Sequence, residues 1–389
     1  MNNETLVMYL NTTKKRARDL GIPLAGKTGK WNAITDVPGV EVGYTTLIEG
    51  EGDLVVGKGP ICTGVTAILP RGRQKKPQPV WAGQFDLNGN GELTGSHWIK
   101  DAGYFASPIC ITNTHSVGMA HHATTAWMIE QHKEHFQGSH SWAMPVIAET
   151  YDGMLNDICG QHITSDHVFN ALNSASTGML EEGNVGGGTG MQSYEFKGGT
   201  GTSSRLVEIE DKEYTIAALV QSNFGLRAEF TVCGVPVGQH ITDNAIISEN
   251  IGHETGSIIV IIATDIPMLP IQLQRLAKRG AIGISRTGSY GGHFSGDIML
   301  AFSTGNNIDM PPLGAEQPRS FNLECINDAH MDVIYEAAVQ AVEESVLNAM
   351  VAAKSVATIK PANRILEAID HLALCDVMRQ YNRLYTRSA

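Results

Sequence analysis

Short apolar runs alternate with amphipathic stretches along the chain, without long polar linkers between them. Apolar runs bounded by glycine, proline or asparagine predict strands, and apolar residues at helical spacing predict helices. The expected strands are 65–69, 109–112, 145–148, 257–263 and 297–302, with a hairpin of 215–220 and 229–232 joined by 221–225. The expected helices are 117–136, 270–278 and 327–355. Paired strands with helices before and after them favour a layered α+β sandwich over a regular βαβ alternation.

The charge balance argues against a partner rich in phosphate. The chain carries 28 Lys and Arg against 40 Asp and Glu, a net charge of −12, whereas a nucleic-acid surface needs an excess of positive charge. The clearest basic cluster stands beside two prolines and is expected to be a solvated loop, so no nucleic-acid partner is predicted. The cluster consists of Arg71, Arg73, Lys75 and Lys76.

Cysteine usage and hydropathy indicate the compartment. Six cysteines are dispersed without a C-x-x-C pair, which is typical of small buried hydrophobes in a reducing environment. No run approaches the ~18 apolar residues of a membrane span, and residues 1–21 lack a basic start followed by an apolar stretch. The expectation is a cytoplasmic protein without a membrane partner.

The densest motif is a glycine tract over residues 183–205, which holds eight glycines. It fails both phosphate-loop patterns. Lys197 does not follow a Walker-type G-x-x-x-x-G, and Met191 and Ser193 stand where a dinucleotide fingerprint requires its third glycine. Two interpretations stay open: a set of turns and bulges, or backbone that approaches other groups closely. No cofactor is expected.

Fourteen histidines raise the possibility of a metal site. His121-His122, His132-x-x-His135 and His140 lie close together, but no H-E-x-x-H is present and no cysteine stands at a zinc-ligand offset. The favoured interpretation is a helix surface with scattered histidines and no metal.

Ser257 stands where a polar loop ends in Gly256-Ser257 and an apolar run begins at once. A hydroxyl nucleophile needs exposure at an element edge, a base and an oxyanion site. If the bond before Ser257 is cut, the new α-amino group supplies a base with a pKa of ~7.7–8.0. A simple turn is the competing interpretation.

Two further segments offer suitable partners. Ser295 and Asp297 are two residues apart at a loop-to-strand junction, and such a pair points to one side of a strand. Asn223 ends an apolar run before Gly225 and could present its amide to an oxyanion. A capped turn at 295–297 and a turn-stabilising asparagine are the alternatives.

Eight blocks, in order from about Ile34 to Thr304, resemble the DmpA-type aminopeptidases, a family that includes L-aminopeptidase/D-esterase-amidases and β-peptidyl aminopeptidases such as BapA. The blocks are ITDVPGVEVGYTT, ITNTHSVG, PVIAETYDG, NVGGGTGMQSYEFKGGTGTSSR, LVQSNFG, GSIIVIIATDIPMLPIQLQRLAKR, RTGSYGGHFSGDI and LAFST. Eight ordered blocks are far more specific than any single motif.

The resemblance implies an αββα four-layer sandwich of the DOM type, similar in layering to N-terminal nucleophile hydrolases. It implies a single catalytic domain over 1–389 that cuts itself between Gly256 and Ser257, giving an α chain of 1–256 and a β chain of 257–389. It also implies a homo-oligomer of such αβ units.

The resemblance further assigns roles by matching positions. Ser257 would be the nucleophile, and Ser295 and Asp297 would orient and polarise it. Asn223 matches the oxyanion asparagine, and Tyr151 matches a tyrosine that lines the substrate site. Glu149 and Asp152 flank Tyr151 and are candidate partners for the amino group of the substrate. β-Peptidyl members carry Glu where this chain has Asp297.

The implied function is hydrolysis of N-terminal residues from short peptides, amino acid amides or esters through an acyl-enzyme. Three alternatives stay open. One is a β-peptide-specific aminopeptidase. Another is an acyltransferase of the ornithine acetyltransferase type, although those enzymes use Thr where Ser257 stands. The third is an uncleaved binding protein that keeps the fold.

Overall fold

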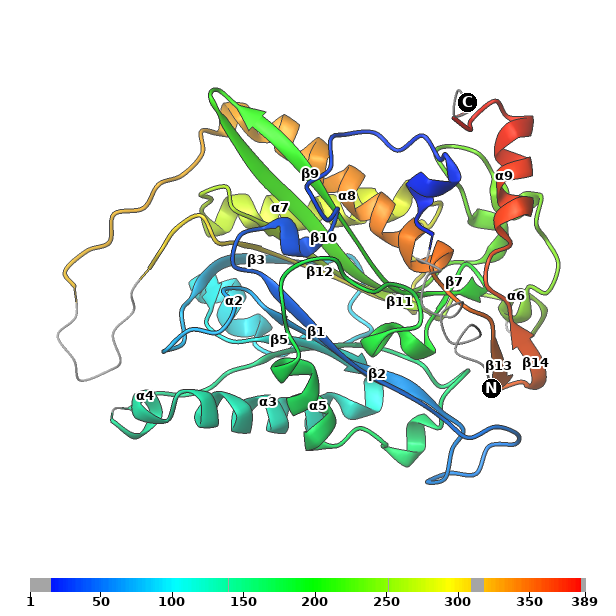
Figure 1. Ribbon diagram of the computed structural model, residues 1–389, viewed down its shortest axis with the longest axis horizontal. Coiled ribbons are helices and arrows are strands. Elements are labelled where there is room, and N and C mark those ends of the chain that lie inside the picture. The colour runs from blue at the N-terminus through cyan, green and yellow to red at the C-terminus, as the bar shows by residue number, and fades with distance from the viewer. Residues whose placement is uncertain (1–14, 139, 251, 309–317, 386–389) are drawn as a thin grey trace, which may run out of the picture.

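Two β-sheets lie face to face between two layers of helices in the computed structural model (Figure 1). The structure describes residues 15–138, 140–250, 252–308 and 318–385. Most of the opening segment that the leader prediction concerned therefore lies outside the described residues.

The larger sheet has six strands and carries both segments that the sequence marked around Ser257 and Asp297. Strands β11 and β12 are parallel, and the other neighbours run antiparallel. In sheet order the strands are β4 (Tyr104–Phe105), β3 (Val80–Asp86), β12 (Gly296–Ser303), β11 (Ser257–Thr264), β10 (Lys212–Asn223) and β9 (Gly199–Ile209).

The smaller sheet has four strands, all from the first half of the chain. Its order is β1 (Glu41–Glu49), β2 (Ile61–Leu69), β5 (Ile109–Asn113) and β6 (Val146–Thr150). Two short pairs lie apart from the main sheets, β7 (Gln192–Ser193) with β8 (Phe196–Lys197), and β13 (Val356–Ile359) with β14 (Ala362–Leu366).

Helices cover the outer face of each sheet (Figure 1). The helices α7 (Pro270–Ser285) and α8 (Met331–Val351) pack on the six-stranded sheet, and α3 (Val117–Gln131) and α5 (Ser165–Asn173) pack on the four-stranded one. The remaining helices are α2 (Ser96–Ala102), α4 (Lys133–Gln137), α6 (Ile246–Asn250) and α9 (His371–Gln380). Short 3-10 helices are η1 (Ala17–Leu20), η2 (Ile34–Asp36), η3 (Thr114–Ser116), η4 (Ile158–Gly160), η5 (Gly186–Gly190), η6 (Arg227–Glu229), η7 (Val237–Gln239) and η8 (Asp328–His330).

Three apolar cores separate the four layers. Strand β11 shows why its sequence is apolar throughout: Ile258, Val260 and Ile262 pack toward α7 and α8, while Ile259 and Ile261 pack toward the other sheet. A third core joins the four-stranded sheet to α3 and α5. A strand buried on both faces reads as a continuous apolar run. The expected αββα sandwich is confirmed.

Most predicted elements lie where the apolar pattern placed them, but the hairpin of 215–220 and 229–232 is wrong. Strand β10 continues to Asn223 and pairs with β9 upstream and β11 downstream. The second arm instead carries the 3-10 turn η6. Strand β9 was missed because its first half is glycine, serine and threonine. These residues are buried but give no apolar signal in a hydrophobicity pattern.

All three predicted helices differ in length from their predictions. The expected helix 327–355 is shorter at both ends, because α8 spans Met331–Val351 and follows the 3-10 turn η8. The stretch 117–136 is interrupted at His132, whose φ of −122° and ψ of 42° lie outside helical values, so it forms α3 and α4. Helix α7 extends to Ser285, past the expected end at 278. Its later glycines allow close packing, because a Cβ at Gly280 would lie 2.7 Å from Met299 and one at Gly283 would lie 2.6 Å from Val342.

Candidate active site

Three strand ends meet at Ser257, the first residue of β11. Its partners in the neighbouring strands are Asn223, the last residue of β10, and Gly296, the first residue of β12. The Ser257 hydroxyl oxygen accepts a 3.0 Å hydrogen bond from the Gly296 N–H. Ser257 is 7 % exposed. The fold thus puts the hydroxyl at the end of a central strand, where the sheet meets the loop that precedes β11.

Glycines let the backbone close around Ser257 from both sides. A Cβ at Gly256 would lie 2.2 Å from the carbonyl oxygen of Asn223, and one at Gly296 would lie 2.3 Å from the carbonyl oxygen of Asn90. Such distances leave no space for a side chain. The peptide bond between Gly256 and Ser257 is therefore held directly against the corner that follows Asn223.

Ser295 and Asp297 are in direct contact, although Ser295 lies in the loop just before β12 and not within the strand. The Ser295 hydroxyl donates to the Asp297 carboxylate, and both residues are fully buried. Side-chain alternation directs Asp297 to the face of Met299, toward the helices, while Ser257 faces the other sheet. Gly296 lies between Ser295 and Asp297 in the chain, and its N–H donates to the Ser257 hydroxyl. This backbone group connects the pair to the serine.

The Asp297 carboxyl holds its proton more tightly than an ordinary aspartate. Burial raises its pKa to about 6, and the nearby charge of Glu254 adds to the increase, while hydrogen bonds from Ser295 and Asn88 act in the opposite direction. Asn88 lies 3.4 Å from the carboxylate through its amide nitrogen. A carboxyl with this pKa changes charge close to neutrality.

The Asn223 side chain is fixed at both ends. Its Oδ1 accepts a 2.9 Å hydrogen bond from the Gln192 N–H, and its Nδ2 donates over 3.1 Å to the carbonyl oxygen of Tyr151. An amide nitrogen has two hydrogens, so one remains for another acceptor. Because Asn223 and Ser257 are directly opposed in adjacent strands, that donor lies beside the serine.

Tyr151 and Glu149 come from the end of β6 in the other sheet. Tyr151 directly follows the strand and is 46 % exposed. Glu149 is buried, and its carboxylate accepts from the Glu92 N–H at 2.9 Å and from the Thr114 hydroxyl; burial raises its pKa. A Cβ at Gly91 would lie 3.2 Å from Glu149 Oε1 and 3.4 Å from Gly296 Cα. Glu149 therefore lies at the same edge as Ser257.

Asp152 occupies a different environment, although it follows Tyr151 in sequence. It is fully buried, and its oxygens accept from Thr63 Oγ1 at 2.6 Å and from Asn156 Nδ2 at 2.9 Å. Burial raises its pKa to about 7. Of the two carboxylates on either side of Tyr151, Glu149 is thus the one that lies close to the strand end with Ser257.

The glycine tract is buried backbone between the two sheets, not a set of surface turns. A Cβ at Gly187 would lie 2.1 Å from Gln221 Oε1, and one at Gly188 would lie 2.2 Å from the Thr200 nitrogen. The 3-10 helix η5 contacts β2 and β9. Of the two interpretations that the sequence left open, close approach of the backbone is the one that the structure shows.

Several residues that contact the site carried no recognisable signal in the sequence. Gln192 and Asn88 hold Asn223 and Asp297 by hydrogen bonds. Glu254, three residues before Ser257, accepts from the Gly225 N–H at 2.6 Å and the Gly292 N–H at 3.1 Å. Lys197 was considered only as a failed phosphate-loop lysine, yet it is fully buried. The only sign of its burial in the sequence is its position between Phe196 and two glycines.

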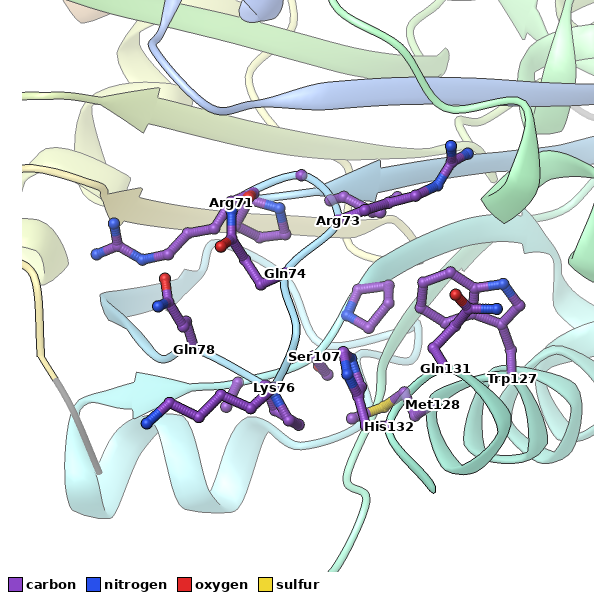
Figure 2. Close-up of a pocket in the computed structure, with 16 residues that line it drawn as sticks. Arg71, Arg73, Gln74, Lys76, Gln78, Ser107, Trp127, Met128, Gln131 and His132 are labelled. Atoms are coloured by element: carbon purple, nitrogen blue, oxygen red, sulfur yellow. Dashed lines mark hydrogen bonds between the residues drawn. The ribbon is translucent and has the colours of Figure 1, made fainter. Parts of the chain in front are cut away.

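The basic cluster lies in the loop that follows β2 and lines a small pocket. Ser257 does not line this pocket. Figure 2 shows that the charged ends of Arg71, Arg73 and Lys76 point in different directions rather than into one site. Arg71 donates to the carbonyl oxygens of Pro79, Thr304 and Asn306, and Arg73 donates to those at the end of α5. The segment is a loop as predicted, but its arginines are bound to backbone instead of being simply solvated.

All six cysteines are unpaired; Cys62, Cys110 and Cys375 are buried as expected, whereas Cys159 and Cys325 are exposed. Within the described ranges, no group of three or more His, Cys, Asp or Glu could hold a metal ion. No helix in the described part of the chain is long and apolar enough to cross a membrane.

Comparison with known proteins gives the family. The model of peptidase family S58 matches residues 32–363. The chain belongs to peptidase family S58. The β-peptidyl aminopeptidase BapA of Sphingosinicella microcystinivorans is 47 % identical to this S58 peptidase over 380 residues, covering 95 % of this chain and 93 % of the relative.

Solved structures agree with this assignment and with the fold. The L-aminopeptidase D-Ala-esterase/amidase of Ochrobactrum anthropi, described as a prototype for the serine aminopeptidases and a variant of the Ntn hydrolase fold, superposes with a TM-score of 0.89 at 50 % identity, covering 95 % of this chain and 99 % of that one. A β-aminopeptidase of Burkholderia sp. gives 0.86 at 43 % identity, covering 94 % and 99 %. The resemblance to DmpA-type aminopeptidases is confirmed.

Proposed function

We propose that this S58 peptidase is a self-processing serine aminopeptidase whose nucleophile is Ser257. The observation that carries the proposal is the meeting of three strand ends at one edge: Ser257 directly follows a close-packed Gly256, with Asn223 opposite it in one strand and Gly296 in the other. A hydroxyl, an amide donor and a susceptible peptide bond thus lie within one small volume.

Self-processing would begin with attack of the Ser257 hydroxyl on the carbonyl carbon of Gly256. The acyl group moves from the serine nitrogen to its oxygen, and the nitrogen becomes a free α-amino group. Water then hydrolyses the ester and leaves a carboxylate on Gly256. The products are chains 1–256 and 257–389, which stay within one sheet because β11 and β12 lie between β10 and β3.

Substrate hydrolysis would reuse the same groups. The free α-amino group of Ser257, with an ordinary pKa of ~7.7–8.0, takes the proton of the hydroxyl as the oxygen attacks the substrate carbonyl. The oxyanion receives hydrogen bonds from Asn223 Nδ2 and nearby backbone N–H groups, each donor contributing about 10²–10³ in rate. The leaving amine takes the proton, and water releases the acyl-enzyme. Ser295 and Asp297 hold the Gly296 peptide that binds the hydroxyl.

Glu149 is the proposed partner of the substrate's free amino group. Its carboxylate is buried close to the edge that carries Ser257 and lies next to the half-exposed Tyr151. A buried carboxylate is stabilised by an ammonium and left unmatched by an acylated amine. The substrate class is therefore short peptides, amides or esters with a small, unblocked N-terminal residue.

Two alternatives within this chemistry stay testable. Two relatives are named β-peptidyl aminopeptidase, and this similarity argues for β-residues as substrates of this chain. Asp297 argues against it, because β-peptidyl members are expected to carry Glu at this position. Comparing the kcat/KM values for anilides of L-alanine and β-alanine decides between them.

Acyl transfer to an added amine, measured against hydrolysis, tests the acyltransferase alternative. A homo-oligomer of αβ units and a cytoplasmic location stay predictions, the first measurable by light scattering.

Self-processing is tested by mass spectrometry of the purified protein. We expect a chain that begins SIIVIIATD, since cleavage falls between Gly256 and Ser257. An active protein that still runs as one 41.9 kDa chain would contradict the proposal and favour the uncleaved alternative.

Amine recognition is tested with free and N-acetylated alanine anilide on the processed enzyme. The acetylated anilide should have a far lower kcat/KM than the free one. Glu149→Gln should raise KM for the free anilide and so bring the two kcat/KM values closer together. Glu208→Gln is the control, because it removes one negative charge from an exposed position on β9, away from Glu149. Equal turnover of the two substrates by the unaltered enzyme would show that the amine is not recognised.

A further inference from the structure

Lys197 is a fully buried cation beneath the candidate site. Its ammonium donates to the carbonyl oxygens of Met191 at 2.7 Å, Gly198 at 2.9 Å and Gly188 at 3.4 Å. Burying a charge is costly unless its hydrogen-bonding capacity is met. Here three donors meet three carbonyl oxygens, all from the glycine tract.

One of these carbonyls belongs to the peptide group that fixes Asn223. The Met191 oxygen accepts from Lys197, and the Gln192 nitrogen of the same peptide donates to Asn223 Oδ1 at 2.9 Å. Asn223 Nδ2 is the donor that lies beside Ser257. A continuous chain therefore runs from the ammonium through a backbone amide and a side-chain amide to the candidate oxyanion site.

The geometry points to Lys197 as a positioning residue that orients and polarises Asn223 through the peptide between Met191 and Gln192. The inference rests on the proposed function, because it assumes that Asn223 stabilises the oxyanion. A positive charge on the carbonyl oxygen withdraws electrons from that peptide and makes its N–H a stronger donor. The Asn223 amide is polarised in turn, since hydrogen bonds in series strengthen one another in a low dielectric.

The ammonium form is the one that fits the site. A neutral amine has two hydrogens and could not donate to all three carbonyl oxygens at once. Burial lowers the pKa of Lys197 to about 8, while the facing groups Asp152 and Cys62 act to raise it. The Asp152 carboxyl belongs to the loop after β6, and Cys62 belongs to β2. The lysine therefore keeps its proton at neutral pH.

The test is Lys197→Met on the processed enzyme, combined with Asn223→Ala in a double-mutant cycle. Lys197→Met should lower kcat by about tenfold or more, short of the 10²–10³ expected for loss of the oxyanion donor itself, with KM little changed. In the Asn223→Ala background it should cause no further loss, because its effect acts through Asn223. If processing slows, the self-cleavage rate gives the same readout, since that step also passes through an oxyanion.

Controls separate this role from a structural one. Thr200→Val removes another buried hydrogen bond within the tract, from Thr200 Oγ1 to the Val185 carbonyl at 2.9 Å, and should lower thermal stability without lowering kcat. Lys197→Gln keeps amide donors without the charge and should have a kcat between those of the wild type and Lys197→Met. It carries the test if Lys197→Met does not fold.

The outcomes distinguish the two proposals. Wild-type kcat in both Lys197 variants, with Asn223→Ala impaired, overturns the inference and leaves the proposed function standing. Losses that multiply in the double variant overturn it as well, because Lys197 would then act independently of Asn223. Wild-type kcat in Asn223→Ala would instead remove Asn223 from the proposed mechanism.

Discussion

Lys197 and Arg205 are both fully buried cations, but their charges are compensated in different ways. Lys197 is held by backbone carbonyl oxygens. Arg205 forms an ion pair of 2.7 Å with Glu344 of α8, and Arg18 contacts the same carboxylate at 2.9 Å. The first region has a charge without a directly bonded counter-charge, and the second has charges of both signs in contact.

This difference appears in the pKa values around each cation. Burial raises the pKa of Asp152, which faces Lys197, to about 7, and it raises the pKa of Asp297, which follows Gly296 at the candidate site, to about 6. Burial also raises the pKa of Glu344, but Arg205 and Arg18 outweigh it and hold that pKa below its ordinary value. Asp297, which is adjacent to the Gly296 that binds the Ser257 hydroxyl, is thus poised to change charge near neutrality, whereas Glu344 is held ionised.

The ion-pair region has a second property, because it joins the two proposed products of self-processing. Arg18 and Arg205 precede the Gly256–Ser257 bond, and Glu344 follows it. Arg286 and Glu343, both after the bond, add a further pair at 2.6 Å. We expect this cluster to hold the chains together, and the candidate site to govern activity with little effect on assembly.

The largest expected effect is that of Ser257→Ala. The variant should stay a single chain and lose all hydrolysis of an alanine anilide, since one hydroxyl serves both reactions. Its melting temperature should change little, because the serine lies at a strand end. Gel electrophoresis and an activity assay check both points, and Ser203→Ala, a buried serine outside the site, is the control. Retained turnover would move the nucleophile elsewhere, with Ser295 examined next.

The ion-pair region should respond in the opposite way. Glu344→Gln removes the carboxylate that is directly bonded to the buried Arg205 and should lower the free energy of unfolding by about 3–5 kcal/mol. The kcat of the surviving folded enzyme should be unchanged. Denaturant unfolding and size-exclusion chromatography of the processed chains measure the loss of stability and of assembly. Wild-type stability in this variant would contradict the role given to the cluster.

The pH dependence of stability should have opposite signs in the two regions. Asp152 binds its proton more tightly when folded, so its contribution is lost as pH rises from about 4 to about 7. Over that range the wild type should lose about 1.4 kcal/mol per pH unit relative to Asp152→Asn. Glu344, with a lowered pKa, contributes stability that is lost as pH falls instead. Unfolding curves of the wild type, Asp152→Asn and Glu344→Gln across pH check the two signs. If both variants change the slope of the unfolding free energy against pH in the same direction, the two regions do not differ in this way.

The smallest expected effect is that of a chelator. Neither the sequence nor the described residues offer a metal-ligand cluster, so dialysis against a strong chelator should leave kcat/KM unchanged. Loss of activity that added zinc restores would show that histidines or carboxylates at the site bind a metal after all.

The sequence by itself determined the layered fold class and the segments that surround Ser257. Apolar runs of β11 and β12 are buried on both faces, so their hydrophobicity identified them without any partner. The spacing of Ser295 and Asp297 predicted that they share one side, but the hydrogen bond between them forms at the entry to β12, because Ser295 lies just before the strand. The hairpin prediction failed because register and partner choice depend on a glycine-rich strand, β9, that has no apolar signature.

Only the tertiary structure decided which polar residues meet. Glu149 and Asp152 are three residues apart and equally plausible in sequence, yet their surroundings differ because one ends a strand and the other turns into the interior. Lys197 looked like a misplaced phosphate-binding lysine until its three carbonyl partners were seen. Hydrogen bonds between segments far apart in the chain depend on angles and distances that packing sets, and residue order does not contain them.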